Sequence, residues 1–157
     1  MPPSTDTSQV ANTGIELTRL GLGVATQGRL FRDLSDDEAT AVFESAWKAG
    51  IRYFDTAPWY GLGLAEQRIG KFLRSKEGYV LSSKVGWLLR EGISTQLAEK
   101  PYSTVYDFSY DGFMRSFEES LERLGVDTLD IMTLTRWELP LKEGSVNRVP
   151  LKNVPPT

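Results

Sequence analysis

The sequence contains no cysteine and no histidine among its 157 residues. The absence of cysteine excludes disulfide bonds and cysteine-based metal sites. The absence of histidine removes the usual general base and the commonest metal ligand. Any acid/base chemistry must therefore depend on carboxylates, tyrosine or lysine.

Long apolar runs and an excess of positive charge are also absent. No apolar run approaches the ~20 residues that cross a bilayer, so no membrane partner is expected. The formal net charge of −3 argues against a nucleic-acid partner, because phosphate binding needs clustered positive charge. The N-terminal segment lacks the basic start and apolar stretch of a secretory signal. We therefore expect a flexible leader over residues 1–16 and a cytoplasmic location.

Short apolar runs alternate with helical patterns along the rest of the chain. The sequence Ser35-x-x-Glu38 predicts a capping box that starts a helix, and Gly50 predicts its end. A second helix is expected along Ala65–Leu73, and a third from Ser109 to Gly125. The apolar positions predicted to face the core are Ala39, Val42, Phe43, Ala46 and Trp47 in the first helix, Ala65, Ile69, Phe72 and Leu73 in the second, and Phe113, Phe117, Leu121 and Leu124 in the third.

Four strands are expected between these helices, over residues 18–24, 51–55, 79–84 and 128–134, with a long loop from about 85 to 107. Alternating strands and helices predict a parallel sheet with right-handed crossovers. Such a sheet belongs either to a doubly wound fold or to a (β/α)₈ barrel, and periodicity alone does not decide between them. Residues 136–157 contain four prolines and no period, so we expect an irregular tail there.

Three residues with reactive side chains are expected at one edge of this sheet. Asp55 and Lys84 end neighbouring strands, and parallel strands lie ~4.8 Å apart. Tyr60 follows Asp55 in a short loop that can fold back over the same edge. A cation beside a phenol stabilises the phenolate, and a carboxylate can orient that cation. Such a phenol can exchange a proton with a carbonyl oxygen near neutral pH, a step that accompanies hydride transfer to or from a nicotinamide.

Spacing alone also allows a simpler interpretation, and favours it: an ordinary ion pair between Asp55 and Lys84, with Tyr60 as a loop aromatic. Trp59 and Trp87 can either line a substrate pocket or pack the loops. The sequence Gly21-Leu22-Gly23 can let backbone approach a cofactor or simply end a strand, because it lacks the third glycine of the dinucleotide fingerprint.

Several segments together resemble the aldo/keto reductase family, in particular its aldose 1-dehydrogenase branch, which includes D-threo-aldose, L-fucose and pyridoxal dehydrogenases. They are GLGVATQG, FDTAPWYGLGLAEQRIGKFL, SSKVGWLLR and SYDGFMRSFEESLERLGVDTLDI. The resemblance runs from about Leu17 to Ile131. It implies that residues 17–135 form the N-terminal half of a (β/α)₈ (TIM) barrel, with about the first four strands and three helices.

The resemblance also implies the chemistry. The family binds NADP(H) or NAD(H) and transfers hydride to or from an aldehyde, a ketone or, in this branch, C1 of an aldose. Its catalytic Asp, Tyr and Lys correspond to Asp55, Tyr60 and Lys84. Its backbone beside the nicotinamide corresponds to Gly23 and Val24, together with Asp55.

Two departures from the family pattern bear on activity. The family's fourth strand ends in a catalytic histidine, and Thr135 stands at that position here. The family's grip on the cofactor pyrophosphate comes from the last strands of the barrel, beyond the matched stretch. We therefore expect an incomplete and inactive chain, whose residues 136–157 arise from a frameshift or a missed splice site. The alternative is a non-catalytic homologue or pseudogene product that acts at most as an interaction partner.

Overall fold

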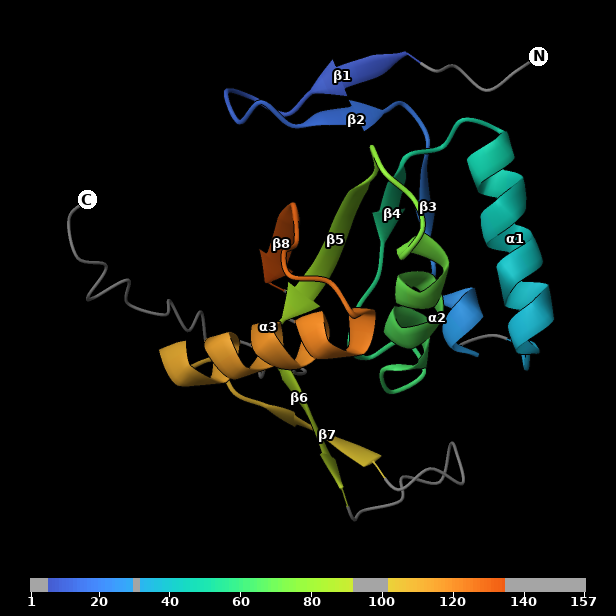
Figure 1. Ribbon diagram of the computed structural model, residues 1–157. Helices are drawn as coiled ribbons and strands as arrows, with labels where there is room; N and C mark the ends of the chain where they lie inside the picture. The colour runs from blue at the N-terminus through green and yellow to red at the C-terminus, as the bar shows by residue number, and fades with distance from the viewer. Residues whose placement is uncertain (1–5, 30–31, 92–101, 135–157) are drawn as a thin grey trace, which may run out of the picture.

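The computed structural model describes residues 6–29, 32–91 and 102–134 (Figure 1). A parallel sheet with the strand order β3-β4-β5-β8 forms its centre. Its strands are β3 (Gly21–Gly23), β4 (Tyr53–Asp55), β5 (Val80–Val85) and β8 (Ile131–Leu134). The connections contain α1 (Asp36–Lys48), α2 (Leu64–Leu73) and α3 (Tyr110–Leu124). The predicted parallel sheet of four strands joined by three helices is confirmed.

The two faces of this sheet differ in polarity, because side chains alternate along each strand. One face packs against the helices and forms the hydrophobic core. The fully buried members of that core are Val24, Phe54 and Leu81 from the sheet side, and Ala39, Phe43, Ala65, Ile69, Leu73 and Leu124 from the helices. The opposite face carries Tyr53 and Asp55 on β4 beside Ser82 and Lys84 on β5, in the register that pairs Asp55 with Ser82. The sheet therefore presents a row of polar side chains away from the helices.

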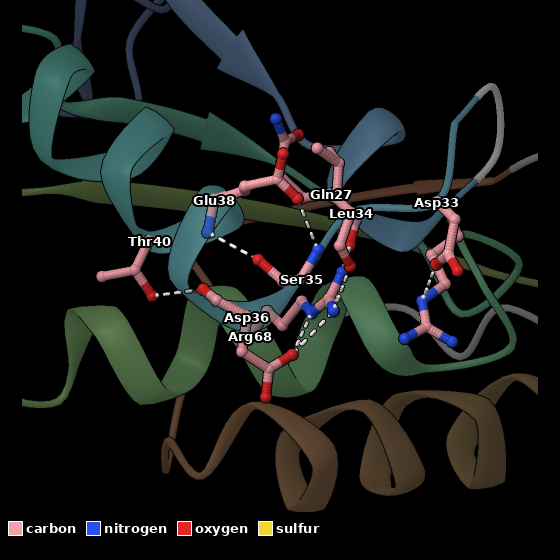
Figure 2. A network of polar contacts seen from close by, with 9 residues as sticks. Gln27, Asp33, Leu34, Ser35, Asp36, Glu38, Thr40 and Arg68 are labelled. Carbon is pink, nitrogen blue, oxygen red and sulfur yellow. Dashed lines mark hydrogen bonds and ion pairs between the residues drawn. The ribbon is translucent and has the colours of Figure 1, made fainter.

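Helix α1 begins at the capping box that the sequence predicts. The Ser35 hydroxyl accepts a hydrogen bond from the Glu38 backbone N–H at 3.2 Å, and the Glu38 carboxylate accepts one from the Ser35 N–H at 2.8 Å (Figure 2). The hydrogen bond from the Ser35 backbone holds the pKa of Glu38 below its ordinary value. Three acidic residues in the first turn add favourable interactions with the helix dipole.

The segment from 85 to 107, predicted as a long loop, instead contains two antiparallel strands, so that prediction was wrong. They are β6 (Trp87–Glu91) and β7 (Tyr102–Tyr106). The adjacent apolar residues of β6 give no clean alternation. Trp87 and Leu88 are nevertheless both buried, and the Ser116 hydroxyl of α3 donates to the Trp87 carbonyl oxygen at 2.9 Å. Tertiary contacts with α3 therefore fix this strand where local periodicity is weak.

A second hairpin, formed by β1 (Thr7–Gln9) and β2 (Glu16–Thr18), occupies part of the expected flexible leader. Figure 1 shows it across the N-terminal ends of the parallel strands, at the end of the sheet opposite the arrowhead of β5. The Arg52 backbone N–H donates to the Thr18 hydroxyl at 3.2 Å and so joins the hairpin to the start of β4. Because β1 is exposed throughout, its sequence carries no apolar alternation that would reveal a strand.

The buried face of α3 also differs from the prediction. The helix buries Gly112, Ser116 and Ser120 together with Leu124, whereas Phe113, Phe117 and Leu121 are only half-buried. The small side chains allow α3 to approach its neighbours closely. A Cβ atom at Gly70 of α2 would collide with the Leu124 carbonyl group, so glycine is required at this crossing.

Thr135 and the expected irregular tail at 136–157 lie outside the described residues. Within the ranges that the structure covers, no helix is long and apolar enough to span a membrane.

A buried arginine joins α2 to the segment before α1. The Arg68 guanidinium, with a side chain only 6% exposed, donates to the Gln27 carbonyl oxygen at 2.6 Å and the Leu34 carbonyl oxygen at 2.8 Å. It also pairs with the Asp36 carboxylate at 2.6 Å, and this contact lowers the pKa of Asp36 (Figure 2). One side chain of α2 thus holds the backbone at two places before α1, at Gln27 and at Leu34.

We expect Arg68→Ala to lower the free energy of unfolding by about 2–3 kcal/mol, because it leaves two carbonyl oxygens without their donor. Urea unfolding followed by circular dichroism measures this loss. Arg74→Ala, at an exposed position after the same helix, is the control and should change stability by less than about 0.5 kcal/mol. Equal losses in the two variants would contradict a clamping role for Arg68.

Candidate active site

The carboxyl ends of β4 and β5 bring Asp55 and Lys84 into direct contact. The Lys84 ammonium donates to the Asp55 Oδ2 atom at 2.6 Å and to the Thr56 carbonyl oxygen at 2.8 Å. The Lys84 side chain is 18% exposed and that of Asp55 is 30% exposed, so the pair is partly shielded and yet open at one side. The Asp55 Oδ1 atom accepts a hydrogen bond from the Ser82 hydroxyl at 2.7 Å. The juxtaposition expected from strand ends is therefore present.

Tyr60 completes this cluster from the loop between β4 and α2. The Lys84 Nζ atom lies 4.9 Å from the centroid of the Tyr60 ring, a separation typical of a cation–π contact. The loop is held in place by close backbone packing: a Cβ atom at Gly61 or at Gly28 would collide with the backbone of the other segment. Gly61 also has a φ of +66°, which glycine adopts without strain. These two glycines therefore allow the close backbone packing that positions the loop, and with it Tyr60, at the edge of the sheet.

Trp59 and Trp87 contact each other beside the cluster, with ring centroids 4.8 Å apart. Trp87 is 6% exposed and belongs to a series of aromatic contacts that continues through Tyr106 and Phe108. Trp59 is 38% exposed and lies at the solvent end of the series. Trp87 thus packs the β6–β7 hairpin, and Trp59 offers a free ring surface next to Tyr60. A role for either ring in substrate binding stays a prediction.

Gly23 lies next to Asp55 in the sheet register and leaves open space on the polar face. A Cβ atom at Gly23 would meet no other atom within 4 Å. The following residue, Val24, is fully buried, and its backbone N–H donates to the Asp55 carbonyl oxygen at 2.9 Å. A flat ring can therefore approach the backbone here and lie beside the Asp55–Lys84 pair. The residues present at this edge fit a nicotinamide ring.

A buried ion pair behind the cluster was not found from the sequence. The Glu66 carboxylate on α2 is fully buried, accepts from the Arg123 guanidinium of α3 at 2.6 Å, and accepts from the Ser83 hydroxyl of β5 at 2.7 Å. Burial raises the pKa of Glu66, and the nearby Arg123 opposes this shift. A signal was present: Glu66 lies three and seven residues before Ile69 and Leu73, on the apolar stripe of its helix.

We expect Arg123→Met to lower the free energy of unfolding by about 3–5 kcal/mol at pH 7–8, because it leaves a buried carboxylate without its counterion. With the pKa of Glu66 raised in the folded state, the folded chain binds the proton more tightly than the unfolded chain. The destabilisation should therefore shrink as the pH falls towards 4.5, the ordinary value for this side chain. Urea unfolding at a series of pH values measures it.

Arg115→Met is the matched control for this experiment. The Arg115 guanidinium pairs with Asp107 at 3.0 Å, but its side chain is 51% exposed. Its loss should cost less than about 1 kcal/mol. A cost for Arg123→Met that stays constant with pH would contradict the assignment of Glu66 as the uncompensated charge.

The match to the aldo/keto reductase family covers residues 19–146, and this chain belongs to that family. The chain is 46% identical to D-threo-aldose 1-dehydrogenase of a Pseudomonas species over 136 residues, and 40% identical to pyridoxal 4-dehydrogenase of Microbacterium luteolum over 139 residues. These alignments cover 79% and 78% of this chain and 41% of each relative. The chain thus spans about two fifths of the length of the curated relatives it matches. The resemblance stated from the motifs is confirmed.

Solved structures of the family share the fold. The glycerol dehydrogenase of Gluconobacter oxydans superposes with a TM-score of 0.67 at 27% identity, covering 83% of this chain and 39% of that one. An aldo-keto reductase of Klebsiella pneumoniae, solved in complex with NADPH, gives a TM-score of 0.57 at 25% identity, covering 82% and 39%. The parallel sheet and its helices therefore form part of a (β/α)₈ barrel, as the resemblance implied.

Proposed function

We propose that this chain supplies the proton-handling groups of a nicotinamide-dependent oxidoreductase. The substrate is a small aldehyde or ketone, or an aldose that reacts at C1. The observation that carries the proposal is the position of the Lys84 ammonium, which contacts the Asp55 carboxylate and faces the Tyr60 ring. Family membership and the 46% identity to an aldose 1-dehydrogenase support the same reaction class.

Each residue of the cluster has a separate task in this proposal. The Tyr60 hydroxyl donates a proton to the substrate carbonyl oxygen during reduction and accepts it from the alcohol during oxidation. The Lys84 ammonium lies 4.9 Å from the centroid of the Tyr60 ring and supplies a positive charge beside that exchange. The Asp55 carboxylate holds the ammonium in place and balances its charge. Tyr60, Lys84 and Asp55 are the catalytic residues on this proposal.

Gly23, Val24 and Asp55 are the residues that would hold the nicotinamide of NADP or NAD. The open space above Gly23 and the firmly packed backbone at Val24 support this assignment. The cofactor, when bound, supplies or accepts the hydride at the substrate carbon. The Trp59 ring would then border the substrate, because it adjoins Tyr60 and is partly exposed, and Trp87 would support this ring from below through their 4.8 Å contact.

A second candidate is a non-catalytic homologue that acts as an interaction partner. One observation favours it: Thr135 stands at the position where the family pattern places a histidine. On this alternative the 157-residue chain retains the cluster without turning over a substrate. Turnover by a chimera that joins this chain to the C-terminal part of a relative distinguishes the two functions.

For the 157-residue chain alone, we expect no saturable binding of NADPH. The grip on the pyrophosphate implied by the family resemblance lies beyond the matched stretch, and a nicotinamide contact alone gives little affinity. Titrating the chain into NADPH while following the cofactor's fluorescence measures this. A dissociation constant in the micromolar range would show that the chain carries a working cofactor site by itself.

A chimera tests the proton-handling groups. Residues 1–134 would be joined to the remaining C-terminal part of the Pseudomonas D-threo-aldose 1-dehydrogenase. We expect oxidation of an aldose with NAD or NADP, and a fall in kcat of at least about 100-fold on Tyr60→Phe, because the proton donor is removed.

Tyr110→Phe, at a position 77% exposed, is the matched control for the chimera and should leave kcat unchanged. If the chimera with Tyr60→Phe keeps kcat within a few fold of its parent, Tyr60 is not the proton donor. If a folded chimera oxidises no aldose and reduces no aldehyde, the non-catalytic alternative is the better description.

A further inference from the structure

We propose that Ser82, held by Tyr53, is a positioning residue that fixes the Asp55 carboxylate so that it can hold Lys84. The proposal rests on the proposed function for the task that Lys84 performs. It adds two residues that are neither part of the catalytic cluster nor among the positions matched to the family's catalytic motif. A chain of hydrogen bonds on the polar face of the sheet joins these two residues to Asp55.

Both oxygens of the Asp55 carboxylate are occupied by donors from β5. Ser82 lies directly beside Asp55 in the sheet register, and its hydroxyl donates to the Oδ1 atom at 2.7 Å. Lys84 lies two residues further along β5 and donates to the Oδ2 atom at 2.6 Å. With a donor at each oxygen, the carboxylate cannot rotate without losing a charge-assisted hydrogen bond. Ser82 therefore fixes the plane of the carboxylate and the position of the oxygen that Lys84 contacts.

The number of available hydroxyl protons determines which group donates in the hydrogen bond between Tyr53 and Ser82. The Tyr53 and Ser82 hydroxyl oxygens lie 3.1 Å apart. Serine has one hydroxyl proton, and an ionised carboxylate can only accept, so the Ser82 proton is directed to Asp55. The Tyr53 hydroxyl must therefore donate to the Ser82 oxygen. The Tyr53 bond uses a lone pair of the Ser82 oxygen and leaves the Ser82 proton for Asp55, whose oxygen is nearer at 2.7 Å than the Phe54 carbonyl oxygen at 3.5 Å.

Gly21 makes room for the tyrosine. Gly21 is the register partner of Tyr53 on β3, and a Cβ atom at Gly21 would lie 2.5 Å from the Cδ1 atom of the Tyr53 ring. Any larger residue would displace the ring and its hydroxyl. The two glycines of β3 thus differ in role: Gly21 accommodates Tyr53, while Gly23 leaves space beside Asp55. The hydrogen-bonded series extends from Tyr53 through Ser82 and Asp55 to Lys84.

The neighbouring serine provides a matched control within the same strand. Ser82 and Ser83 are 0% and 1% exposed, and each donates one hydrogen bond of 2.7 Å to a carboxylate. They point to opposite faces of β5, so the Ser83 hydroxyl bonds to Glu66 on the helix side, while the hydrogen bonds to the Asp55 carboxylate among the described residues come from Ser82 and Lys84. Replacing either serine by alanine removes the same atom from an equally buried position.

The test uses the full 157-residue chain labelled with ¹⁵N-lysine, and no cofactor or substrate is needed. The ¹⁵N signal of the Lys84 ammonium is assigned by its absence in Lys84→Arg. In Ser82→Ala we expect that signal to shift or broaden. We also expect acylation of Lys84 by an N-hydroxysuccinimide ester, followed by mass spectrometry, to become about two- to tenfold faster, as the loss of one hydrogen bond allows.

Ser83→Ala should lower the melting temperature by a similar amount but leave the Lys84 signal and its acylation rate unchanged. Tyr53→Phe removes only the outer hydroxyl and should shift the Lys84 signal in the same direction as Ser82→Ala by a smaller amount. If Ser82→Ala does not fold, Tyr53→Phe decides the question alone.

The proposal is overturned if Ser82→Ala leaves Lys84 as in the parent chain, or if Ser83→Ala changes Lys84 equally. An unchanged Lys84 signal in Tyr53→Phe would also overturn the part assigned to Tyr53. These results are independent of turnover. An inactive chimera in which Lys84 still responds to Ser82→Ala would reject the proposed function and keep the positioning role.

Discussion

The alternation of side chains along β5 is the constraint on which both the site and the core depend. Ser82 and Lys84 point to the polar face and contact Asp55, whereas Leu81 and Ser83 point to the helices. A shift of one residue in register would exchange the two sets and place an ammonium in the hydrophobic core. The same pairing that buries Leu81 therefore delivers Lys84 to the sheet edge.

Close contacts between backbone segments also help to define the site. Gly70 lets α2 and α3 cross closely enough for the Glu66 carboxylate to reach both Arg123 and Ser83. A buried ion pair gains little net stability over apolar packing, but breaking it is costly. The Glu66–Arg123 pair therefore restricts how α2, α3 and β5 can pack. The strand that carries Lys84 is held on one face by the helices and on the other by Asp55.

Much of this arrangement could be predicted from the sequence, because it follows from local rules. The helical spacing of apolar residues and the capping residues predicted the three helices. The positions of Asp55 and Lys84 at the carboxyl ends of neighbouring parallel strands predicted that they lie side by side. The rest depends on tertiary contacts. The β6–β7 hairpin is fixed by contacts with α3, and the sequence of residues 87–91 alone does not reveal these contacts. The buried face of α3 consists of small residues such as Ser116 and Ser120, and these serve close packing rather than a hydrophobic pattern.

Strand β8, at the edge of the described sheet, exposes apolar side chains. Met132 and Leu134 of β8 pair with Ser83 and Val85 and lie on the face that the helices cover elsewhere, yet they are 41% and 60% exposed. On the polar face, Thr133 pairs with Lys84 and brings β8 to the edge of the cluster. In a (β/α)₈ barrel both faces of such a strand are enclosed, one by the helical layer and one by the barrel interior. Enclosure would exclude water from Asp55, Lys84 and Tyr60 and so strengthen the electrostatic interactions that their proposed chemistry uses.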